Sequence, residues 1–355
     1  MRTLGFAGAA KNTGKTTAAL HLLDLARAAG RRCALTSAGY DGEDFDQVTG
    51  LPKPRYYAQT GMLVATAERC LQASSAQFSG IQPTGLTTIL GEVLLAQVSQ
   101  PGEVILAGPN RQTDVSALLR QLASRGADLV ILDGALNRAA ALAPADGLVF
   151  STGAAFDERI EVIARHAAAV EALFLQPGTH SSIESGAHIL FQNSQGRRET
   201  HPLSSVLEEA VMAQVAAWFE PGRGGQCWIP GAFSPALFAE MLRRHAAQLA
   251  GGRFIFTSPL HLLASGSPLT WGTCLNQLAN LGASLEFLSA KRLYLLTVNP
   301  FFPHYAQKSG HYSPAYVDKI ALLEACRASV KGTPVVDILS PPHPDLLALC
   351  EGNPA

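Results

Sequence analysis

The chain has 355 residues, of which 47% are hydrophobic and 15% charged, and its formal net charge is −1. This length is about twice that of a typical domain, so we expect two domains or one large α/β unit. The composition excludes a disordered polymer, a coiled coil and a collagen-like chain. Because the net charge is close to zero, no global field favours DNA or an anionic membrane, and we expect neither as a partner.

The spacing of the six cysteines excludes a CxxC pair, and none lies beside a histidine at zinc-finger spacing. We therefore expect reduced, mostly buried thiols. Lys11 and Lys15 interrupt the N-terminus before a signal-peptide core forms. No uncharged apolar run reaches the ~18 residues of a membrane-spanning helix. Together these observations predict a cytoplasmic protein.

The first half of the chain alternates short apolar runs with helical patterns. It begins with a strand predicted at residues 3–7, and residues 16–29 carry apolar side chains at helical spacing before Gly30 ends the helix. Continuous apolar strands that alternate with helices predict an α/β fold, with a parallel sheet covered by helices on both faces. The further strands expected in this half are residues 33–37, 104–107, 129–132 and 148–151.

The second half resumes the alternation after two breaks. Residues 192–200 read as a polar connection and residues 220–226 as a second break. Ser234 is placed to cap a helix that has Pro235 at its first position. We predict a nucleotide-binding domain at residues 1–185 and a second α/β domain at residues 186–355, which would bind a partner or a substrate. The strands expected in the second half are residues 227–229, 253–257, 285–288, 293–298 and 334–338.

The segment GAAKNTGKTT, residues 8–17, is the most informative part of the sequence. Gly14, Lys15 and Thr16 fit the second half of the phosphate-loop (P-loop, Walker A) pattern GxxxxGK[ST], whereas Ala9 stands at its first glycine. A predicted strand precedes the segment and a predicted helix follows it. The alternative is an ordinary Gly/Ala-rich turn between a strand and a helix. The residues predicted to bind nucleotide are Gly8, Lys11, Asn12, Thr13, Gly14, Lys15, Thr16 and Thr17.

The residue types of this segment suit the chemistry of ATP and Mg²⁺. Gly14 allows the backbone to approach phosphate, and the N–H groups at the start of the helix point at the anion. Lys15 would pair with the β- and γ-phosphates, and the Thr16 hydroxyl would bind Mg²⁺. The chain is therefore a candidate P-loop ATPase.

Acidic residues at two other places would complete the site. Asp133 ends an apolar run in the Walker B arrangement, where a carboxylate holds Mg²⁺, although it could instead cap a turn with Gly134. Asp41, Glu43 and Asp44 follow the second predicted strand, where one of them could orient water or Mg²⁺, and the alternative is a solvated acidic loop. We predict catalytic roles for Lys15, Asp41, Asp44 and Asp133.

These features resemble the phosphate-loop class that includes dethiobiotin synthetase and the MinD-type ATPases. The resemblance covers about the first 150 residues and implies that an acidic residue after the second strand joins the loop and the Walker B aspartate. The additional lysine of the MinD family falls on Ala10 here, so its role in dimer catalysis does not transfer to Lys11. No NKxD motif for guanine is present, which favours adenine.

Three loops of the second half carry candidate functional groups. They begin at Pro230, Ser258 and Asn299, each after a predicted strand. Ligands bind at the carboxyl ends of parallel strands, so we expect these loops at one edge of a sheet. The loop after Asn299 supplies protonatable and stacking groups, although partly packed turn residues are the alternative. These groups are His304, Tyr305, His311 and Tyr312.

Several phrases together are similar to a further family, the smaller subunit of the reactivase for adenosylcobalamin-dependent lysine 5,6-aminomutase, from lysine fermentation operons. The resemblance spans nearly the whole chain and implies partners, a cognate ATPase subunit and the cobalamin-dependent aminomutase, together with a role in exchanging damaged cofactor. The alternatives are a dethiobiotin-synthetase-like ATP-dependent ligase and a nucleotide-binding scaffold protein. The phrases are GAAKNTGKTT, TSAGYDGEDFD, VILAGPN, DLVILDGALNR, STGAA, WIPGAF and LTVNPFFP.

Overall fold

The computed structural model describes residues 1–41, 56–179, 187–221, 224–306 and 311–351. The chain divides into two compact units: Met1–Ala167 with Leu293–Ala355, and Ala168–Arg292. All six cysteines are buried free thiols, as predicted. Within the part of the chain that is described, none of the helices combines the length and the apolar character that a membrane span requires.

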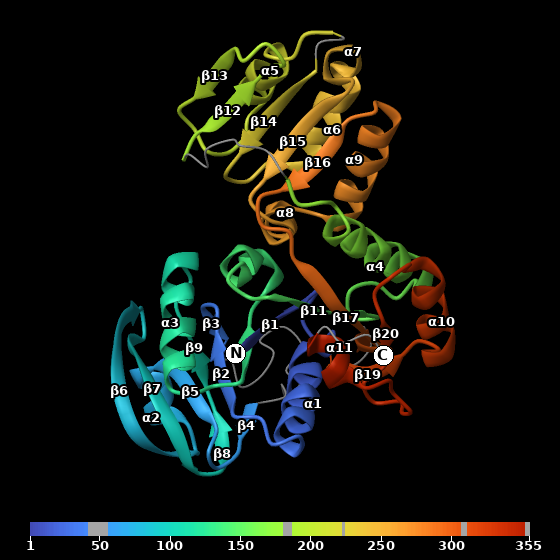
Figure 1. Ribbon diagram of the computed structural model, residues 1–355. Coiled ribbons are helices and arrows are strands. Elements are labelled where there is room, and N and C mark those ends of the chain that lie inside the picture. Colours follow the sequence, from blue (N-terminus) through green and yellow to red (C-terminus); the bar gives the residue numbers. More distant parts are fainter. Residues whose placement is uncertain (42–55, 180–186, 222–223, 307–310, 352–355) are drawn as a thin grey trace. The chain divides into compact units, whose positions relative to one another are not determined.

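The first unit contains a nine-stranded sheet with mixed strand directions (Figure 1). Strand β1 lies between β10 and β11 and runs parallel to both, and the parallel pairing continues from β10 to β2 and from β2 to β5. Strands β7 and β6 extend this edge in antiparallel pairing. In sheet order the strands are β20 (Val335–Val336), β17 (Arg292–Asn299), β11 (Gly147–Gly153), β1 (Arg2–Gly8), β10 (Leu129–Asp133), β2 (Cys33–Ser37), β5 (Leu63–Ala67), β7 (Gly91–Gln100) and β6 (Gln77–Thr88).

The central strands form because their side chains are apolar on both faces. Every residue of β2, β10 and β11 is buried, and so is the interior of β1. Helix α1 (Lys15–Ala28) buries Ala18, Leu22 and Ala26 in the same core cluster as Leu4 and Phe6 of β1. This packing places the start of α1 near the carboxyl end of β1, with only the loop of residues 9–14 between them. The other helices described for this unit are α2 (Glu68–Ala73), α3 (Gln112–Ser124), the 3₁₀ helix η1 (Leu136–Leu142), α10 (Lys319–Ser329) and α11 (Leu346–Glu351).

The strand predicted at residues 104–107 is interrupted. It divides into β8 (Gly102–Val104), which pairs with β4 (Tyr56–Ala58), and β9 (Leu106–Ala107), which pairs with β3 (Tyr40–Asp41). The interruption falls at Ile105, whose N–H donates to Ser74 Oγ and whose carbonyl accepts from Thr66 Oγ1. These side-chain hydrogen bonds replace ladder bonds at that residue.

The predicted boundary between residues 185 and 186 does not match the two units, because the end of the chain returns to the first unit. Strand β17 lies beside β11 in the large sheet, and Leu295 joins the core cluster of β1. The loop expected after Asn299 is a hairpin of β18 (Phe301–Ala306) and β19 (His311–Tyr316). Every residue of β18 has a partner in β19, and the ring centroids of Tyr305 and Tyr312 are 5.1 Å apart.

The second unit has a five-stranded sheet with parallel strands β14, β15 and β16 at one side. The polar connection expected at residues 192–200 is the turn of an antiparallel hairpin formed by β12 and β13, in which residues 198–200 are already part of β13. In sheet order the strands are β13 (Arg198–His201), β12 (Ile189–Gln192), β14 (Gly225–Ile229), β15 (Gly252–Phe256) and β16 (Ser284–Phe287).

Helices cover an aromatic core in this unit. Phe238 contacts Phe254 and Trp271, all three of them buried. Ser234 caps α6 by accepting from the Leu237 N–H, and Pro235 is its first residue, as predicted. The helices are α5 (Glu209–Ala217), α6 (Pro235–Arg244), α7 (Ala246–Leu249), α8 (Pro259–Ser265) and α9 (Pro268–Asn280), and α4 (Ile160–Phe174) leads into the unit (Figure 1).

Candidate functional site

The loop between β1 and α1 is held in one compact conformation. The Ala9 N–H donates to the Ser151 carbonyl of β11 at 2.8 Å, and Thr13 Oγ1 donates to the Ala10 carbonyl at 2.9 Å. Asn12 and Gly14 both have positive φ angles, 64° and 89°. A glycine tolerates this conformation without the steric cost that a Cβ imposes. The glycine at position 14 therefore serves the turn into α1.

Gly8 ends β1 where a larger residue has no room. A Cβ atom at this position would lie 2.6 Å from Thr13 Oγ1. Thr13 is itself buried. The unusual placement of the glycine, one residue before the first glycine of the P-loop pattern, thus has a local steric reason: Gly8 leaves space for the Thr13 hydroxyl, which closes the loop on Ala10.

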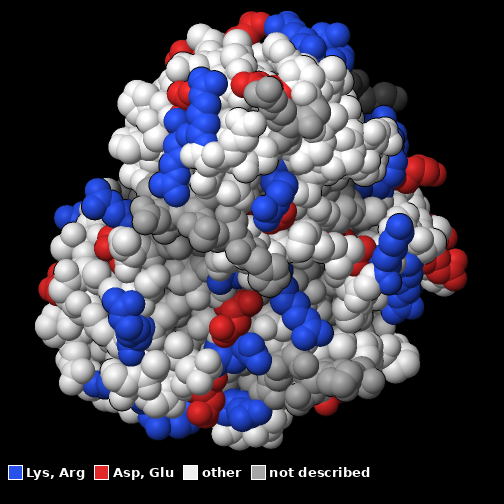
Figure 2. Space-filling view, turned by 45° about the horizontal axis from the view of Figure 1, so that its top comes forward, with Lys and Arg blue, Asp and Glu red and all other residues white. Residues whose placement is uncertain are grey.

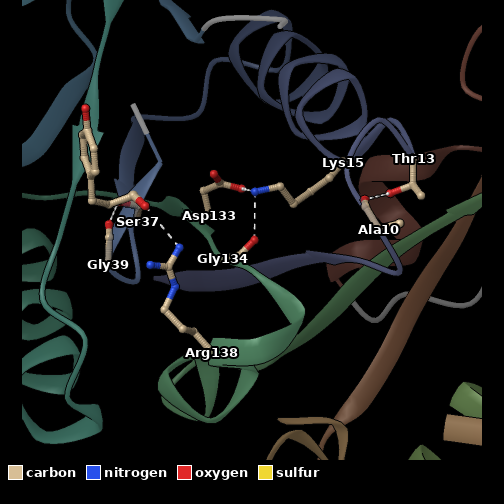
Figure 3. A network of polar contacts seen from close by, with 9 residues as sticks. Ala10, Thr13, Lys15, Ser37, Gly39, Asp133, Gly134 and Arg138 are labelled. Atoms are coloured by element: carbon tan, nitrogen blue, oxygen red, sulfur yellow. Dashed lines mark hydrogen bonds and ion pairs between the residues drawn. The ribbon is translucent and has the colours of Figure 1, made fainter. Parts of the chain in front are cut away.

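Lys15, the first residue of α1, connects this loop to the neighbouring strand β10. Its Nζ donates to Asp133 Oδ1 at 2.6 Å and to the Gly134 carbonyl at 2.8 Å (Figure 3). The Asp133 side chain is only 2% exposed. A carboxylate buried to this extent loses its hydration, so the Lys15 ammonium provides the compensating charge. Two residues that lie 118 positions apart thus form one charged pair.

The sheet register explains why Asp133 lies at the loop. Phe6 of β1 and Ser37 of β2 are its neighbours in the two parallel pairings of β10. Because parallel strands present their carboxyl ends at the same edge of a sheet, Asp133 stands at the edge from which the loop departs. The Asp133 carbonyl also accepts from the Ala38 N–H at 2.7 Å, which joins the end of β10 to the end of β2.

The remaining predicted loop residues lie close to Lys15 along the chain. Thr16 and Thr17 are half-buried in the first turn of α1, and Lys11 is exposed at the loop. Among the described residues, no group of three or more His, Cys, Asp or Glu side chains gathers as a metal site. The Asp133 carboxylate and the Thr16 hydroxyl are both oxygen donors of the kind that Mg²⁺ prefers in proteins.

The acidic segment after β2 is described only at its beginning. Asp41 is the last residue of β3 and pairs with Leu106 of β9 through its backbone. Asp44 lies outside the described residues. Ser37 Oγ donates to the Gly39 carbonyl and accepts from the Gly108 N–H, so the backbone that leads to Asp41 is held by hydrogen bonds. The roles of Asp41 and Asp44 stay predictions.

Two residues without a sequence motif also contact these segments. Asn299, at the end of β17, donates through Nδ2 to the Asn12 carbonyl at 3.0 Å, and its Oδ1 accepts from the Phe301 N–H. Arg138 of η1 donates through Nη2 to the Tyr40 carbonyl at 3.1 Å. The only sequence signal for Asn299 is its place before a proline at a strand end, and none distinguishes Arg138.

The loops that begin at Pro230, Ser258 and Asn299 were expected at one edge of a sheet. The structure shows that they do not share one. The first two follow β14 and β15 of the second unit, whereas Asn299 ends β17 of the first unit. Of the four candidate side chains after Asn299, His304 lies on β18 opposite Ser313, and Tyr305 pairs with Tyr312. The reason for the difference is the return of the chain to the first sheet at β17.

Charged side chains of both signs are interspersed on one face of the molecule. On the face shown in Figure 2, lysine and arginine side chains stand among acidic and uncharged ones, and the described residues there form no continuous positive surface. This distribution agrees with a net charge of −1. Any attraction for an anion must then come from local groups such as Lys15 rather than from the surface as a whole.

Comparisons of the chain with protein-family models, with curated proteins and with solved structures find no match.

Proposed function

We propose that residues 8–17 and Asp133 form a binding site for a nucleoside triphosphate, ATP, with Mg²⁺. The observation that carries this proposal is the 2.6 Å ion pair between Lys15 Nζ and Asp133 Oδ1, because it brings the cation of the loop and the carboxylate of the strand to one point. The loop also follows a buried parallel strand and precedes a helix, the arrangement in which backbone N–H groups bind phosphate.

The ion pair also suggests how the chain's residues respond to the nucleotide. In its absence, Lys15 neutralises the buried Asp133 carboxylate. When phosphate oxygens reach the loop, Lys15 turns from Asp133 to these oxygens, and Asp133 and Thr16 would then hold Mg²⁺. The ion, when bound, neutralises negative charge on the phosphate oxygens during transfer. Asp41 and Asp44 are the proposed positions for orienting water.

Nucleotide titration tests this proposal. A fluorescent ATP analogue is added to the wild type, to Lys15→Ala and to Arg120→Ala, a control that changes an exposed arginine of α3. We expect saturable, Mg²⁺-dependent binding by the wild type and the control, and strongly weakened binding by Lys15→Ala. Equal affinity of Lys15→Ala and the wild type, with circular dichroism showing a folded variant, would refute the phosphate-loop role.

The use of the nucleotide is a separate part of the proposal. We infer that the nucleotide state controls assembly with a cognate ATPase subunit and a cobalamin-dependent aminomutase. The resemblance of the sequence to the smaller reactivase subunit supports this inference. Such control requires the partners to prefer one nucleotide state, since equal affinity for both states shifts no equilibrium.

A reconstitution assay tests the partner role. Inactivated aminomutase is incubated with ATP, Mg²⁺, fresh cobalamin cofactor, the ATPase subunit and this protein, and the recovered mutase activity is measured. We expect recovery to require this protein and to fail with Lys15→Ala. If recovery is unchanged when the protein is omitted, the reactivase role is wrong. ATP consumption that a single metabolite accelerates without partners would instead support the ligase alternative.

A further inference from the structure

Arg138 occupies a special position beside the Lys15–Asp133 pair. It lies five residues after Asp133, in the 3₁₀ helix η1, and its backbone angles (φ −123°, ψ 18°) interrupt the helix there. In the view of Figure 3, the Lys15–Asp133 pair lies between Arg138 and the loop residues Ala10 and Thr13. The chain thus places a second cation at the carboxyl edge of β10 and β2, on the side away from the loop.

The guanidinium of Arg138 packs against backbone rather than against an acidic side chain. Its Nη2 donates to the Tyr40 carbonyl at 3.1 Å. Beside it, Gly39 has a φ of +85°, and a Cβ at Gly39 would lie 2.9 Å from Nη1 and 3.1 Å from Cζ. Gly39 therefore leaves the room in which the flat guanidinium lies. No ion pair of Arg138 is found among the described residues.

One donor of this guanidinium is buried without an acceptor. Arg138 Nε is shielded from solvent, and no hydrogen-bond partner for it is found among the described residues. Buried donors in proteins are nearly always satisfied, so an unsatisfied one calls for a physical explanation. An arginine presents five N–H donors in a planar fork that matches phosphate oxygens. A phosphate group beside Arg138 would draw the guanidinium towards its oxygens and give Nε the acceptor that it lacks.

We propose that Arg138 binds the terminal phosphate of the nucleotide, an inference that rests on the proposed nucleotide site. The loop N–H groups and Lys15 hold the β- and γ-phosphates, and Arg138, the cation across the Lys15–Asp133 pair, adds a second cationic contact to the outermost phosphate. Arg138 then distinguishes a triphosphate from a diphosphate. Its hydrogen bond to the Tyr40 carbonyl also links the phosphate to the backbone that leads into the acidic segment at Asp41.

Paired titrations with fluorescent ATP and ADP analogues in the presence of Mg²⁺ test this inference. The variants are Arg138→Gln, Arg138→Lys and the exposed-surface control Arg120→Gln. Because a charge-assisted hydrogen bond to phosphate is lost, we expect Arg138→Gln to bind ATP about tenfold more weakly and ADP within about twofold of the wild type. Arg138→Lys keeps the charge without the planar fork and should recover part of the ATP affinity.

The outcomes separate this inference from the proposed function. Wild-type affinity for ATP in Arg138→Gln would overturn the role of Arg138 while the nucleotide site stands. Equal losses for ATP and ADP would also overturn it, because the arginine would then support the fold of the site or an inner phosphate. A wild type that binds neither analogue would refute the nucleotide site and, with it, this role. Thermal unfolding of each variant shows whether it is folded.

Discussion

The two units offer parallel strands that lead into helices, yet the groups at the strand ends differ. In the first unit, β1 continues into a glycine-containing loop and Lys15, and β10 ends in the buried Asp133. In the second unit, β15 is followed by Ser258 and the seven-residue helix α8. There the Ser258 hydroxyl hydrogen-bonds His261 Nδ1 at 2.8 Å, and burial lowers the pKa of His261.

The difference shows that a parallel sheet alone does not define an anion site. Both units present the carboxyl ends of parallel strands at a sheet edge. Among the residues that the structure describes, only the first unit pairs a buried carboxylate at such an edge with a lysine at the start of a helix. The Ser258–His261 pair is neutral, because a histidine with a lowered pKa stays unprotonated near pH 7. Charge, and not topology, therefore distinguishes the candidate nucleotide site from the corresponding edge of the second unit.

The largest effect is expected for Lys15→Ala. The substitution removes the cation that we propose binds phosphate, so we expect the affinity for Mg²⁺–ATP to fall about 100-fold, as for the loss of a strong charge-assisted contact. It also leaves the Asp133 carboxylate buried without its cation, which lowers stability. The double variant Lys15→Ala/Asp133→Asn should regain stability in chemical denaturation but not ATP affinity. A double variant that binds ATP as the wild type does would contradict the proposed role of Lys15.

Asp133→Asn should affect turnover more than binding. The amide keeps the size of the side chain but removes the charge that would hold Mg²⁺, whereas Lys15 still reaches the phosphates. We expect the single-turnover rate of ATP hydrolysis to fall at least about tenfold, with a smaller change in affinity. Rate measurements across a range of Mg²⁺ concentrations check this. An unchanged rate at every concentration would exclude Asp133 as a metal ligand.

A buried histidine in the first unit predicts a dependence of stability on pH. His166 contacts Phe150 and Phe156, and burial lowers its pKa to about 4. Since its folded pKa lies below the ordinary value of 6.5, its neutral form contributes fully above pH 6.5, and this contribution falls away as the pH drops towards 4.

Chemical denaturation at pH 7.5 and pH 4.5 measures this effect. From pH 7.5 to pH 4.5, we expect the free energy of unfolding to fall in both proteins. The fall should be larger in the wild type than in His166→Gln by roughly 2–3 kcal/mol, because only the wild type has the histidine with the lowered pKa. The variant retains the carboxylates, so their titration cancels in the comparison. Parallel pH curves for the two proteins would show that His166 is protonated at its ordinary pKa.

The smallest effect is expected for Ser258→Ala in the second unit. The variant loses one neutral hydrogen bond to His261, which should lower stability by about 1 kcal/mol. Nucleotide affinity should stay at the wild-type value, because Ser258 belongs to the uncharged strand end. Thermal unfolding and the ATP titration check both statements. A loss of ATP affinity larger than that of Lys15→Ala would place the nucleotide site in the second unit instead.

Local sequence patterns predicted the strands whose side chains are apolar on both faces. The runs around Phe6, Ile131 and Val149 are strands in the structure because each is buried among neighbouring strands. The helix after the loop was predictable from its apolar face and lies at Lys15–Ala28. In contrast, β6 was missed because its residues are mostly exposed and polar, and it is held by pairing with β7.

The parts that could not be predicted depend on distant contacts. Residues 293–298 read correctly as a strand, but no local pattern reveals that this strand joins the sheet of β1. Asn299 and Arg138 carry no motif, and their contacts with Asn12 and Tyr40 exist only once the chain has folded. The sequence predicted roles for Lys15 and Asp133 separately, but it did not predict that their side chains form an ion pair.

A structure of the protein with Mg²⁺ and a non-hydrolysable ATP analogue is the sharpest test of the proposed nucleotide site. We expect that Lys15 Nζ leaves Asp133, with which it pairs at 2.6 Å, and lies about 3 Å from a phosphate oxygen. Asp133 should then face the metal ion at about 2.1 Å, directly, or farther away through a water molecule. A nucleotide bound elsewhere, with the Lys15–Asp133 pair intact, would contradict the account.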